Sequence, residues 1–260
     1  MTARLAVLLA HPAGHSASPV MHGAAFAEAG IDARYEAWDV PPEGLERAVA
    51  RLRAELIVGA NVTVPHKEAV GAWLDGLRDA ARAVGAVNLI VRDGDRLWGD
   101  NSDAAGFARS LDEAGVAVED RRAVILGAGG AARAVAWSLL QGGVAEVAMW
   151  NRTRARADGV RAALAEAAGV GRLRVIDDPS DAAGSDLWVQ TTSLGMQHGG
   201  VNPATTPIGE AAWPDLLRGV PDPVAIDVVY RPRLTPFLEH AARAGARTVD
   251  GTGMLVHQGA

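Results

Sequence analysis

Short hydrophobic runs alternate with longer amphipathic stretches in the first hundred residues. The hydrophobic runs cover 4–9, 34–40, 56–64 and 86–91, and each predicts a buried strand. Between them, the stretches 18–30, 42–55 and 66–77 carry hydrophobic residues three or four positions apart, which predicts helices. The segment "RDGDRLWGDN" then predicts a hairpin with Asp93-Gly94 in its turn.

The same alternation restarts near residue 122. Residues 122–143 predict a strand, a turn and a helix, and further strand-like runs follow at 146–153, 173–177, 186–192 and 224–230. Residues 195–223, rich in Gly and Pro, predict a long loop or a short irregular helix. Strand–helix–strand alternation produces parallel sheets with right-handed crossovers, so we expect two α/β units joined near 100–121.

Composition narrows the class of protein. The chain has 260 residues, 49% of them hydrophobic and 22% charged, with a net charge of -6 and no cysteine. The negative charge argues against a nucleic-acid partner, and no apolar run is long enough to cross a membrane. The N-terminal stretch favours a strand followed by a loop over a signal peptide, because Pro12 and Gly14 follow it. We expect a cytoplasmic enzyme without disulfide or thiolate chemistry.

One basic residue differs from all the others. The chain has 25 Lys plus Arg, and Lys67, in "NVTVPHK", is the only lysine. A biased base composition explains the arginines, but it would have replaced an ordinary surface lysine too. We therefore expect Lys67 to have a chemical role.

The seven histidines do not predict a metal site. His11 and His15 are four residues apart, but Pro12 and Gly14 prevent a helix between them, and no H-E-x-x-H is present. We expect no bound metal.

The segment "VILGAGGAAR" has the spacing of a dinucleotide-binding turn. A predicted strand ends at Leu126, Gly127 permits a tight turn, and Gly129 lets the backbone approach a pyrophosphate at the start of a helix. Ala132 permits close packing of that helix on the strand. The alternative is a plain strand-to-helix turn.

The end of the next predicted strand indicates which dinucleotide binds. An NAD site has an acidic residue there, whereas this chain has Asn151, Arg152 and Thr153, followed by Arg154 and Arg156. Arginines pair with a 2′-phosphate, so NADP is the expected cofactor. The alternative for Arg154 and Arg156 is a solvated surface position.

Polar residues also interrupt the hydrophobic pattern of the first unit. Ser16 and Ser18 are two apart, so both hydroxyls point one way in an extended chain; the alternative is a helix N-cap at Ser18 with Pro19 behind it. Thr63 ends a strand, Asn88 interrupts "GAVNLIV", and Asp103 opens a helix, where an N-cap is the alternative.

These blocks together resemble one enzyme family. "HSASPVMH", "NVTVPHKE", "GAVNLIV", "DNSDAAGF", "GAGGAARA", "NRT", "QTTSLGM", "DVVYRPRLTPFL" and "GTGMLVHQGA" follow the order seen in shikimate dehydrogenases, over essentially the whole chain. The resemblance implies reversible reduction of 3-dehydroshikimate to shikimate with NADPH (EC 1.1.1.25), in the chorismate route to aromatic amino acids.

The resemblance also implies a domain organisation. It implies an α/β fold with an N-terminal substrate-binding domain, 1–104, rejoined by 241–260, and a Rossmann NADP-binding domain, 105–240. The active site would lie in the cleft between the two domains. We expect a monomer or homodimer whose partners are small molecules.

The resemblance assigns roles residue by residue. Lys67 and Asp103 match the catalytic pair, and the substrate-binding positions are Ser16, Ser18, Thr63, Lys67, Asn88, Asp103, Tyr230 and Gln258. The cofactor-binding positions are Gly127, Ala128, Gly129, Gly130, Ala131, Asn151, Arg152, Thr153, Arg156, Thr192, Val228, Gly251 and Met254.

Two departures from the family pattern affect these assignments. The family usually continues past "HQGA" with a longer helix that packs on the first domain, which bears on Gln258. "QTT" stands where many relatives have "NAT", so Gln190 is not assigned a role.

The expected chemistry is hydride transfer by the cofactor and proton transfer by the protein. Lys67 would polarise the substrate carbonyl and protonate the forming alkoxide, and Asp103 would orient Lys67 and titrate with it as a pair. The alternatives are a dehydrogenase acting on both quinate and shikimate, and a non-catalytic regulator that binds NADP or shikimate. Methylenetetrahydrofolate dehydrogenases also use a lysine, but they lack the two-serine block and "DNSDAAG".

Overall fold

The computed structural model contains two compact units, residues 1–102 and 103–260. It describes residues 4–14, 16–168, 171–197 and 202–259. The predicted α/β fold of two domains is confirmed, and the predicted boundary after residue 104 lies close to the division between the units. Residues 241–260 are grouped with the second unit here, so their return to the first domain stays a prediction.

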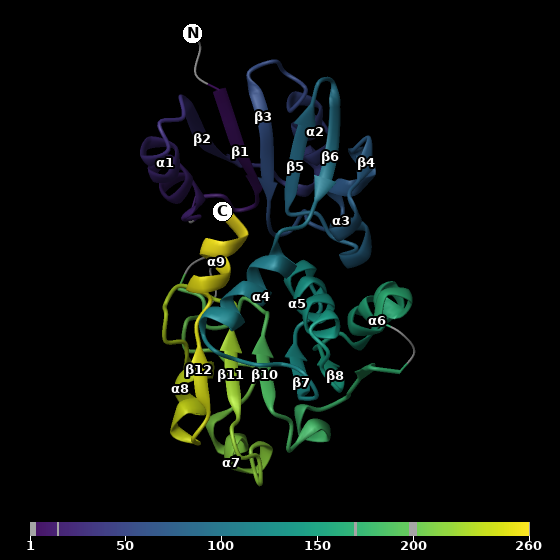
Figure 1. The fold of residues 1–260 in the computed structure, drawn as a ribbon, viewed down its shortest axis with the longest axis vertical. Coiled ribbons are helices and arrows are strands. Elements are labelled where there is room, and N and C mark those ends of the chain that lie inside the picture. Colours follow the sequence, from purple (N-terminus) through teal and green to yellow (C-terminus); the bar gives the residue numbers. More distant parts are fainter. Residues whose placement is uncertain (1–3, 15, 169–170, 198–201, 260) are drawn as a thin grey trace. The chain divides into compact units, whose positions relative to one another are not determined.

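The first unit is built on a six-stranded mixed sheet with the order β2-β1-β3-β5-β6-β4 (Figure 1). β1 pairs in parallel with β2 and β3, while β5 runs antiparallel to β3 and β6. Its strands are β1 (Arg4–Ala10), β2 (Ala33–Asp39), β3 (Ile57–Val62), β4 (Gly76–Leu77), β5 (Leu89–Asp93) and β6 (Arg96–Asp100). Its helices are α1 (Ser18–Glu28), α2 (Leu45–Arg51) and α3 (Asp79–Val84), with short 3₁₀ turns η1 (Pro42–Gly44) and η2 (Val70–Trp73).

The structure corrects two local predictions for this unit. The helix predicted at 66–77 is wrong: the segment forms η2 and the short strand β4. Gly71 and Gly76 weaken a helix, and the backbone of Gly76 instead pairs with Trp98 of β6, so close that a Cβ would lie 2.4 Å from the indole ring. The predicted hairpin is present, but Asp93 is its last strand residue and the turn starts at Gly94, whose φ is +60.

The core of the first unit follows the strand period of two. Val7 and Leu9 of β1 join the cluster that packs under α2, whereas Leu8 and Ala10 point to the opposite face with Ala13.

The second unit is an all-parallel sheet with the order β12-β11-β10-β7-β8-β9 (Figure 1). If β7 to β12 are numbered 1 to 6 and the order is given starting from β9, the sheet has the 3-2-1-4-5-6 order of the Rossmann fold. Its strands are β7 (Arg122–Leu126), β8 (Glu146–Trp150), β9 (Leu173–Val175), β10 (Leu187–Gln190), β11 (Val224–Asp227) and β12 (Arg247–Val249). Its helical segments are α4 (Asp103–Glu113), α5 (Gly130–Gln141), α6 (Arg154–Ala168), η3 (Pro179–Ala182), η4 (Glu210–Ala212), α7 (Trp213–Leu216), α8 (Pro236–Arg243) and α9 (Thr252–Gly259).

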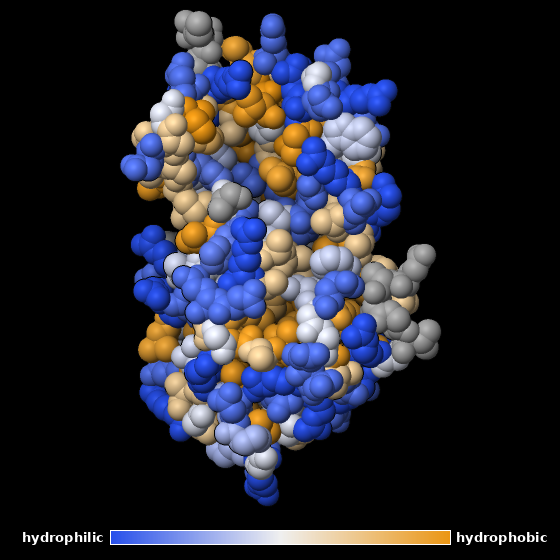
Figure 2. Space-filling model, viewed as in Figure 1, coloured by the Kyte–Doolittle hydropathy of each residue, from blue (hydrophilic) through white to orange (hydrophobic). Residues whose placement is uncertain are grey.

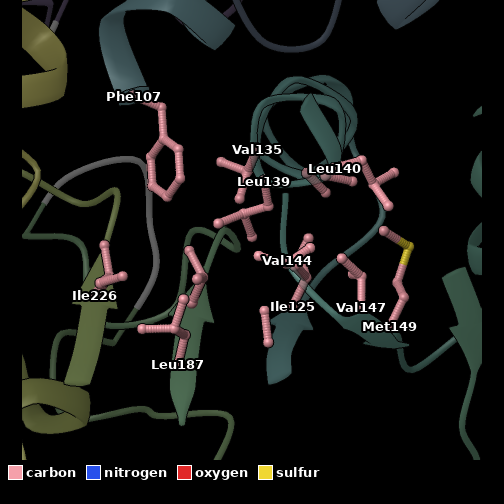
Figure 3. Close-up of a cluster of buried hydrophobic side chains, with 14 of the residues drawn as sticks. Phe107, Ile125, Val135, Leu139, Leu140, Val144, Val147, Met149, Leu187 and Ile226 are labelled. Carbon is pink, nitrogen blue, oxygen red and sulfur yellow. The ribbon is translucent and has the colours of Figure 1, made fainter. Parts of the chain in front are cut away.

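Hydrophobic clusters cover both faces of this sheet. On one face, Phe107 of α4 and Leu139 of α5 pack over Ile125 (Figure 3). On the other face lie Val124 and Leu126 with Trp188, Trp213 and Phe237, whose rings meet edge to face. A sheet buried on both faces explains why these strands read as continuous hydrophobic runs.

The strand order places a topological switch point beside β7. β7 pairs with β8 on one side and with β10 on the other, and the chain crosses the sheet between β9 and β10. In such sheets ligands bind beyond the carboxyl ends of the strands at the switch point. All six strands are parallel, so the loops after β7, β8, β10, β11 and β12 share that edge.

Polar and apolar side chains are mixed on the surface shown in Figure 2. Val20, Val58 and Val64 of the first unit are among the exposed hydrophobic residues. Within the described residues, no helix is both long and apolar enough to span a bilayer.

Candidate functional site

Gly127 makes the turn after β7 and cannot carry a side chain. Its φ is +123, and an added Cβ would lie 2.5 Å from Oγ1 of Thr191 and 3.1 Å from Cγ2 of Thr192. Its amide donates to the carbonyl of Trp150 at 2.8 Å, at the end of β8. The glycine therefore lets three strand ends approach one another at the switch point.

The space in front of α5 suits a phosphate group. Gly129 is the N-cap of this 12-residue helix and has extended backbone angles, with no atom within 4 Å of where its Cβ would be. Ala132 is fully buried against the sheet, as predicted for this position. Free N–H groups and the helix dipole at such an N-terminus bind anions, so residues 127–131 fit a dinucleotide pyrophosphate.

The arginines after β8 have different surroundings. Arg154 pairs with Asp158 at 3.6 Å and with Asp177, so carboxylates already hold it. Arg152 is exposed and forms no ion pair with any residue that the structure describes. Asn151 Nδ2 donates to the carbonyl of Thr153 at 2.9 Å, which stabilises the turn between β8 and α6. Arg152 is thus the guanidinium best placed to meet a 2′-phosphate, and Arg156, four residues later, is also exposed.

The end of β10 contains a polar group to which the sequence analysis assigned no role. Gln190 is fully buried, and its Oε1 accepts from Thr192 N at 2.5 Å and from Thr192 Oγ1 at 2.6 Å. Its Nε2 donates to the carbonyl of Leu194 at 2.9 Å. The fully buried Asp227, opposite Gln190 in the sheet, is a further hydrogen-bond partner of this side chain. A glutamine and an aspartate inside hydrophobic strands are the sequence signal that could have marked them.

Burial raises the pKa of Asp227 to about 7, even though Thr235, Val229 and Gln190 donate hydrogen bonds to it. Thr235 Oγ1 lies 2.6 Å from Oδ2, and Val229 N lies 2.9 Å from Oδ1. The carboxyl therefore links the ends of β10 and β11 with the start of α8.

The remaining predicted cofactor positions follow β11 and β12. A Cβ on Gly251 would lie 2.4 Å from the carbonyl oxygen of Val228, so these two backbones touch. Met254 is 9% exposed and belongs to the core of this unit. Asp250 accepts from Thr252 N and Arg233 Nε, both at 2.8 Å; burial acts to raise its pKa, but these hydrogen bonds lower it overall.

Gln258 and Tyr230 belong to the second unit as well. Gln258 lies on α9 against α4, where a Cβ on Gly106 would come within 2.8 Å of its backbone nitrogen. Its Nε2 donates to the carbonyl of Leu255 at 3.1 Å. Tyr230 follows β11 and is half-buried.

Three predicted substrate positions meet at one end of the two central strands of the first sheet, after β3 and before β5. Val62 N donates to the carbonyl of Asn88 at 2.8 Å, next to Thr63, and Val87 N donates to the carbonyl of Lys67 at 2.7 Å. Lys67 is half-buried, which is unlike a surface lysine. The fold thus brings Thr63, Lys67 and Asn88 together from separate parts of the chain.

Asn88 is fixed by the residue that precedes Asp103. Its side chain is 2% exposed, its Oδ1 accepts from Ser102 N at 2.8 Å, and its Nδ2 donates to Ser102 Oγ at 3.0 Å. Asp103 is the first residue of α4 and is 3% exposed. A carboxylate in the first turn interacts favourably with the helix dipole, and the interpretation of Asp103 as the N-cap stays a prediction.

The two serines have internal partners. α1 begins at Ser18 with Ala17 in the N-cap position, so Ser18 is not the cap. Instead Ser16 Oγ accepts from Ser18 N at 3.2 Å, and Ser18 hydrogen-bonds with Tyr35. Burial raises the pKa of Tyr35, whose hydroxyl donates to Asn61 Oδ1 at 2.7 Å. Both serines are half-buried and hold the start of α1.

A pocket lies on the α1 side of the first sheet, and neither Ser16 nor Ser18 lines it. It is lined by Ala6, His22, Phe26, Tyr35, Val58, Gly59, Ala60, Asn61, Leu89, Ile90 and Val91. None of the predicted substrate positions of this unit lines it. Among the described residues, no three His, Asp or Glu side chains form a group that could hold a metal, and His15 lies outside those residues.

Known families match both units. Residues 8–90 match the shikimate dehydrogenase substrate binding domain, and residues 110–183 match the shikimate / quinate 5-dehydrogenase domain. A shikimate dehydrogenase (NADP(+)) of Symbiobacterium thermophilum is 48% identical, with 99% of this chain and 86% of that protein covered.

Solved structures agree with these matches. The shikimate 5-dehydrogenase of Thermus thermophilus, in complex with NADP(H) and shikimate, is 36% identical with a TM-score of 0.85, covering 99% of this chain and 90% of that one. The enzyme of Listeria monocytogenes, in complex with shikimate and NAD, is 34% identical with a TM-score of 0.85, covering 99% and 89%. Sequence and fold agree over both units, and the chain therefore belongs to the shikimate dehydrogenase family.

Proposed function

We propose that this protein is an NADP-dependent dehydrogenase that interconverts 3-dehydroshikimate and shikimate, a step of chorismate and aromatic amino acid biosynthesis. The observation that carries the proposal is that a match over 99% of the chain to an NADP-dependent relative coincides with a dinucleotide-binding turn at Gly127 and with the chain's single lysine at position 67. A binding protein that had lost catalysis would have no reason to keep that single lysine.

The second unit would hold NADP. Residues 127–131 would accept the pyrophosphate at the N-terminus of α5, and Arg152, with Asn151, Thr153 and Arg156, would bind the adenosine end and its 2′-phosphate. Thr192, Val228, Gly251 and Met254 would lie toward the nicotinamide. When bound, the nicotinamide supplies the hydride.

The first unit would hold the substrate. Ser16 and Ser18 would bind its carboxylate, and Thr63 and Asn88 its ring hydroxyls. Asp103, Tyr230 and Gln258 of the second unit complete the proposed set. Buried hydrogen bonds to Ser102 fix the Asn88 amide in one orientation, which suits a recognition role.

Lys67 would handle the proton. An ammonium polarises a carbonyl and can then protonate the alkoxide, whereas the chain's guanidinium groups cannot release a proton near neutral pH. Asp103, in the first turn of α4, would orient the ammonium.

The test is an absorbance assay at the NADPH band with purified protein. Shikimate and quinate are each offered with NADP and with NAD. Turnover of shikimate with NADP, well above the other three combinations, is the expected result. Cofactor binding without turnover of either substrate would contradict the proposal and favour a non-catalytic regulator.

A second candidate is an enzyme of dual specificity for quinate and shikimate. The family matched by residues 110–183 is described by both substrates, which is the reason to include quinate in the assay. Comparable catalytic efficiency with both acids would favour this candidate. A monomer or homodimer in the cytoplasm remains our prediction for the assembly and its location.

A further inference from the structure

The buried contacts between Asp227 and Gln190 suggest a function beyond packing. Both are fully buried, and each is the last residue of its strand, directly opposite the other in the β10–β11 pair. They lie at the switch-point edge, where the proposed cofactor site is, and neither would touch the substrate chemistry. We propose that Asp227 is a positioning residue: it sets the direction of the Gln190 amide, and that amide holds residues 191–194 against the dinucleotide turn. This inference rests on the proposed NADP site.

The first step is the chemistry of the groups around Asp227. Val229 offers a backbone N–H, Thr235 a hydroxyl and Gln190 an amide NH₂. Gln190 Nε2 donates to the Leu194 carbonyl, and the same nitrogen donates to a carboxyl oxygen of Asp227, which can accept in either protonation state. The carboxyl thus selects one of the two orientations of the amide.

The second step leads from Gln190 to the loop. With Nε2 toward Asp227 and the Leu194 carbonyl, Oε1 faces the N–H and hydroxyl of Thr192. A backbone N–H is only a donor, so the reversed amide would set two donors against each other and leave Thr192 N unpaired in a buried place. The loop is therefore stable in this position only while the amide keeps its direction.

The third step joins the loop to the cofactor turn. Thr191 donates to the carbonyl of Leu126 through both N and Oγ1, each at 2.9 Å. The same Oγ1 is the atom that a side chain on Gly127 would strike. Movement of residues 191–194 would therefore widen or close the space beside the Gly127 turn, which the pyrophosphate is proposed to approach.

The network also has an arm whose hydrogen bonds do not reach residues 191–194, although the Cβ and methyl group of Thr235, which valine keeps, pack beside Gly195. Thr235 binds Asp227 on its other oxygen and caps α8, where its Oγ1 accepts from Leu238 N at 3.4 Å. Thr235→Val keeps the shape and removes this arm. It is the matched control, because it weakens the same buried cluster without touching Gln190.

The experiment measures the dissociation constant of NADP and the melting temperature of the full chain. Asp227→Asn and Gln190→Met should each weaken NADP binding about tenfold, because each leaves the Thr192 donor without a fixed acceptor. The double variant should be no weaker than either single variant, since both changes break one chain of bonds. Thr235→Val should lower the melting temperature and leave NADP affinity within about twofold.

The outcomes separate the two proposals. If the parent protein does not bind NADP, the proposed function is wrong and this inference falls with it. If the parent binds NADP, and Asp227→Asn and Gln190→Met lower only the melting temperature, the role is structural and the inference alone is wrong. Additive losses in the double variant would also contradict it. If Asp227→Asn does not fold, Gln190→Met against Thr235→Val decides.

Discussion

Oγ1 of Thr191 lies where a side chain on Gly127 would have to be, only 2.5 Å from the position of its Cβ. The glycine also has a φ of +123, which side chains rarely tolerate. We expect Gly127→Ala to lower the free energy of unfolding by about 2 kcal/mol and to weaken NADP binding at least about tenfold. Urea unfolding and a cofactor titration measure the two effects.

Gly129→Ala is the matched control for that prediction. Its Cβ would meet no atom within 4 Å and its φ of -99 is ordinary, so stability should stay within about 0.5 kcal/mol of the parent. NADP binding should still fall, because the methyl group occupies the space proposed for the phosphate. A Gly129→Ala variant with unchanged NADP affinity would place the pyrophosphate elsewhere.

Arg152 and Arg154 are expected to differ although they are neighbours in sequence. Arg154 is already paired with Asp158 and Asp177, whereas Arg152 is exposed without such a partner among the described residues. A hydrogen bond to a charged group contributes roughly 1.5–3 kcal/mol. Arg152→Ala should therefore weaken NADP at least about tenfold and leave NAD unchanged, while Arg154→Ala changes NADP affinity little. Equal catalytic efficiency of the parent with both cofactors would show that no arginine recognises the 2′-phosphate.

Periodicity and spacing predicted most of the fold for clear physical reasons. The run before Gly127 predicted a buried parallel strand because both faces of that sheet are covered. The helix predicted at 66–77 failed because the pairing of Gly76 with Trp98 is a contact distant in sequence, which local periodicity does not contain.

Long-range contacts also explain what the sequence left out of the site. Gln190 and Asp227 are 37 positions apart in the numbering, and only the pairing of β10 with β11 makes them neighbours. In the sequence alone, each is only a polar residue at the end of a predicted strand. Ser18 was predicted as a possible cap for a similar reason: its partner, Tyr35, lies on β2.

The pKa of Asp227 predicts how stability changes with pH. The usual value is 3.8, and burial raises it to about 7 in the folded protein. Between these values the folded protein holds a proton that the unfolded chain has released. The contribution of Asp227 to the free energy of unfolding is therefore fully present below about pH 4 and is lost as the pH rises to about 7.

Asp227→Asn removes that titration and gives the measurement. The free energy of unfolding of the parent minus that of the variant should fall by on the order of 2 kcal/mol between pH 5 and pH 8, since carboxylates elsewhere cancel in the difference. Urea unfolding at the two pH values tests this. A difference that does not change with pH would mean that Asp227 is ionised throughout the range.

Substitution of Ser16 tests whether its hydroxyl binds the substrate or only stabilises the start of α1. Its hydroxyl accepts from Ser18 N at 3.2 Å, a long bond whose loss should cost little stability. Ser16→Ala should raise the KM for shikimate about tenfold and leave the KM for NADP nearly unchanged. If the melting temperature falls and neither KM moves, the hydroxyl serves only the start of the helix.

Lys67 gives the most direct test of the proposed chemistry. It is half-buried after β3, and its carbonyl accepts from Val87 N, the residue before Asn88. Arginine keeps the positive charge, but its pKa above about 12 prevents it from giving up a proton, and its planar group is longer. A lysine ammonium can give up a proton and so can act as a general acid.

Lys67→Arg should therefore lower kcat for shikimate oxidation by about 10²–10⁴-fold, the usual contribution of positioned proton transfer. NADP affinity and the melting temperature should stay close to those of the parent, because the backbone contact of Lys67 does not depend on its side chain. Steady-state kinetics of the two proteins, with a cofactor titration and a melting curve as controls, make the comparison. A folded variant that turns over within about fivefold of the parent would mean that the only lysine of the chain is an accident of composition, and that another group moves the proton.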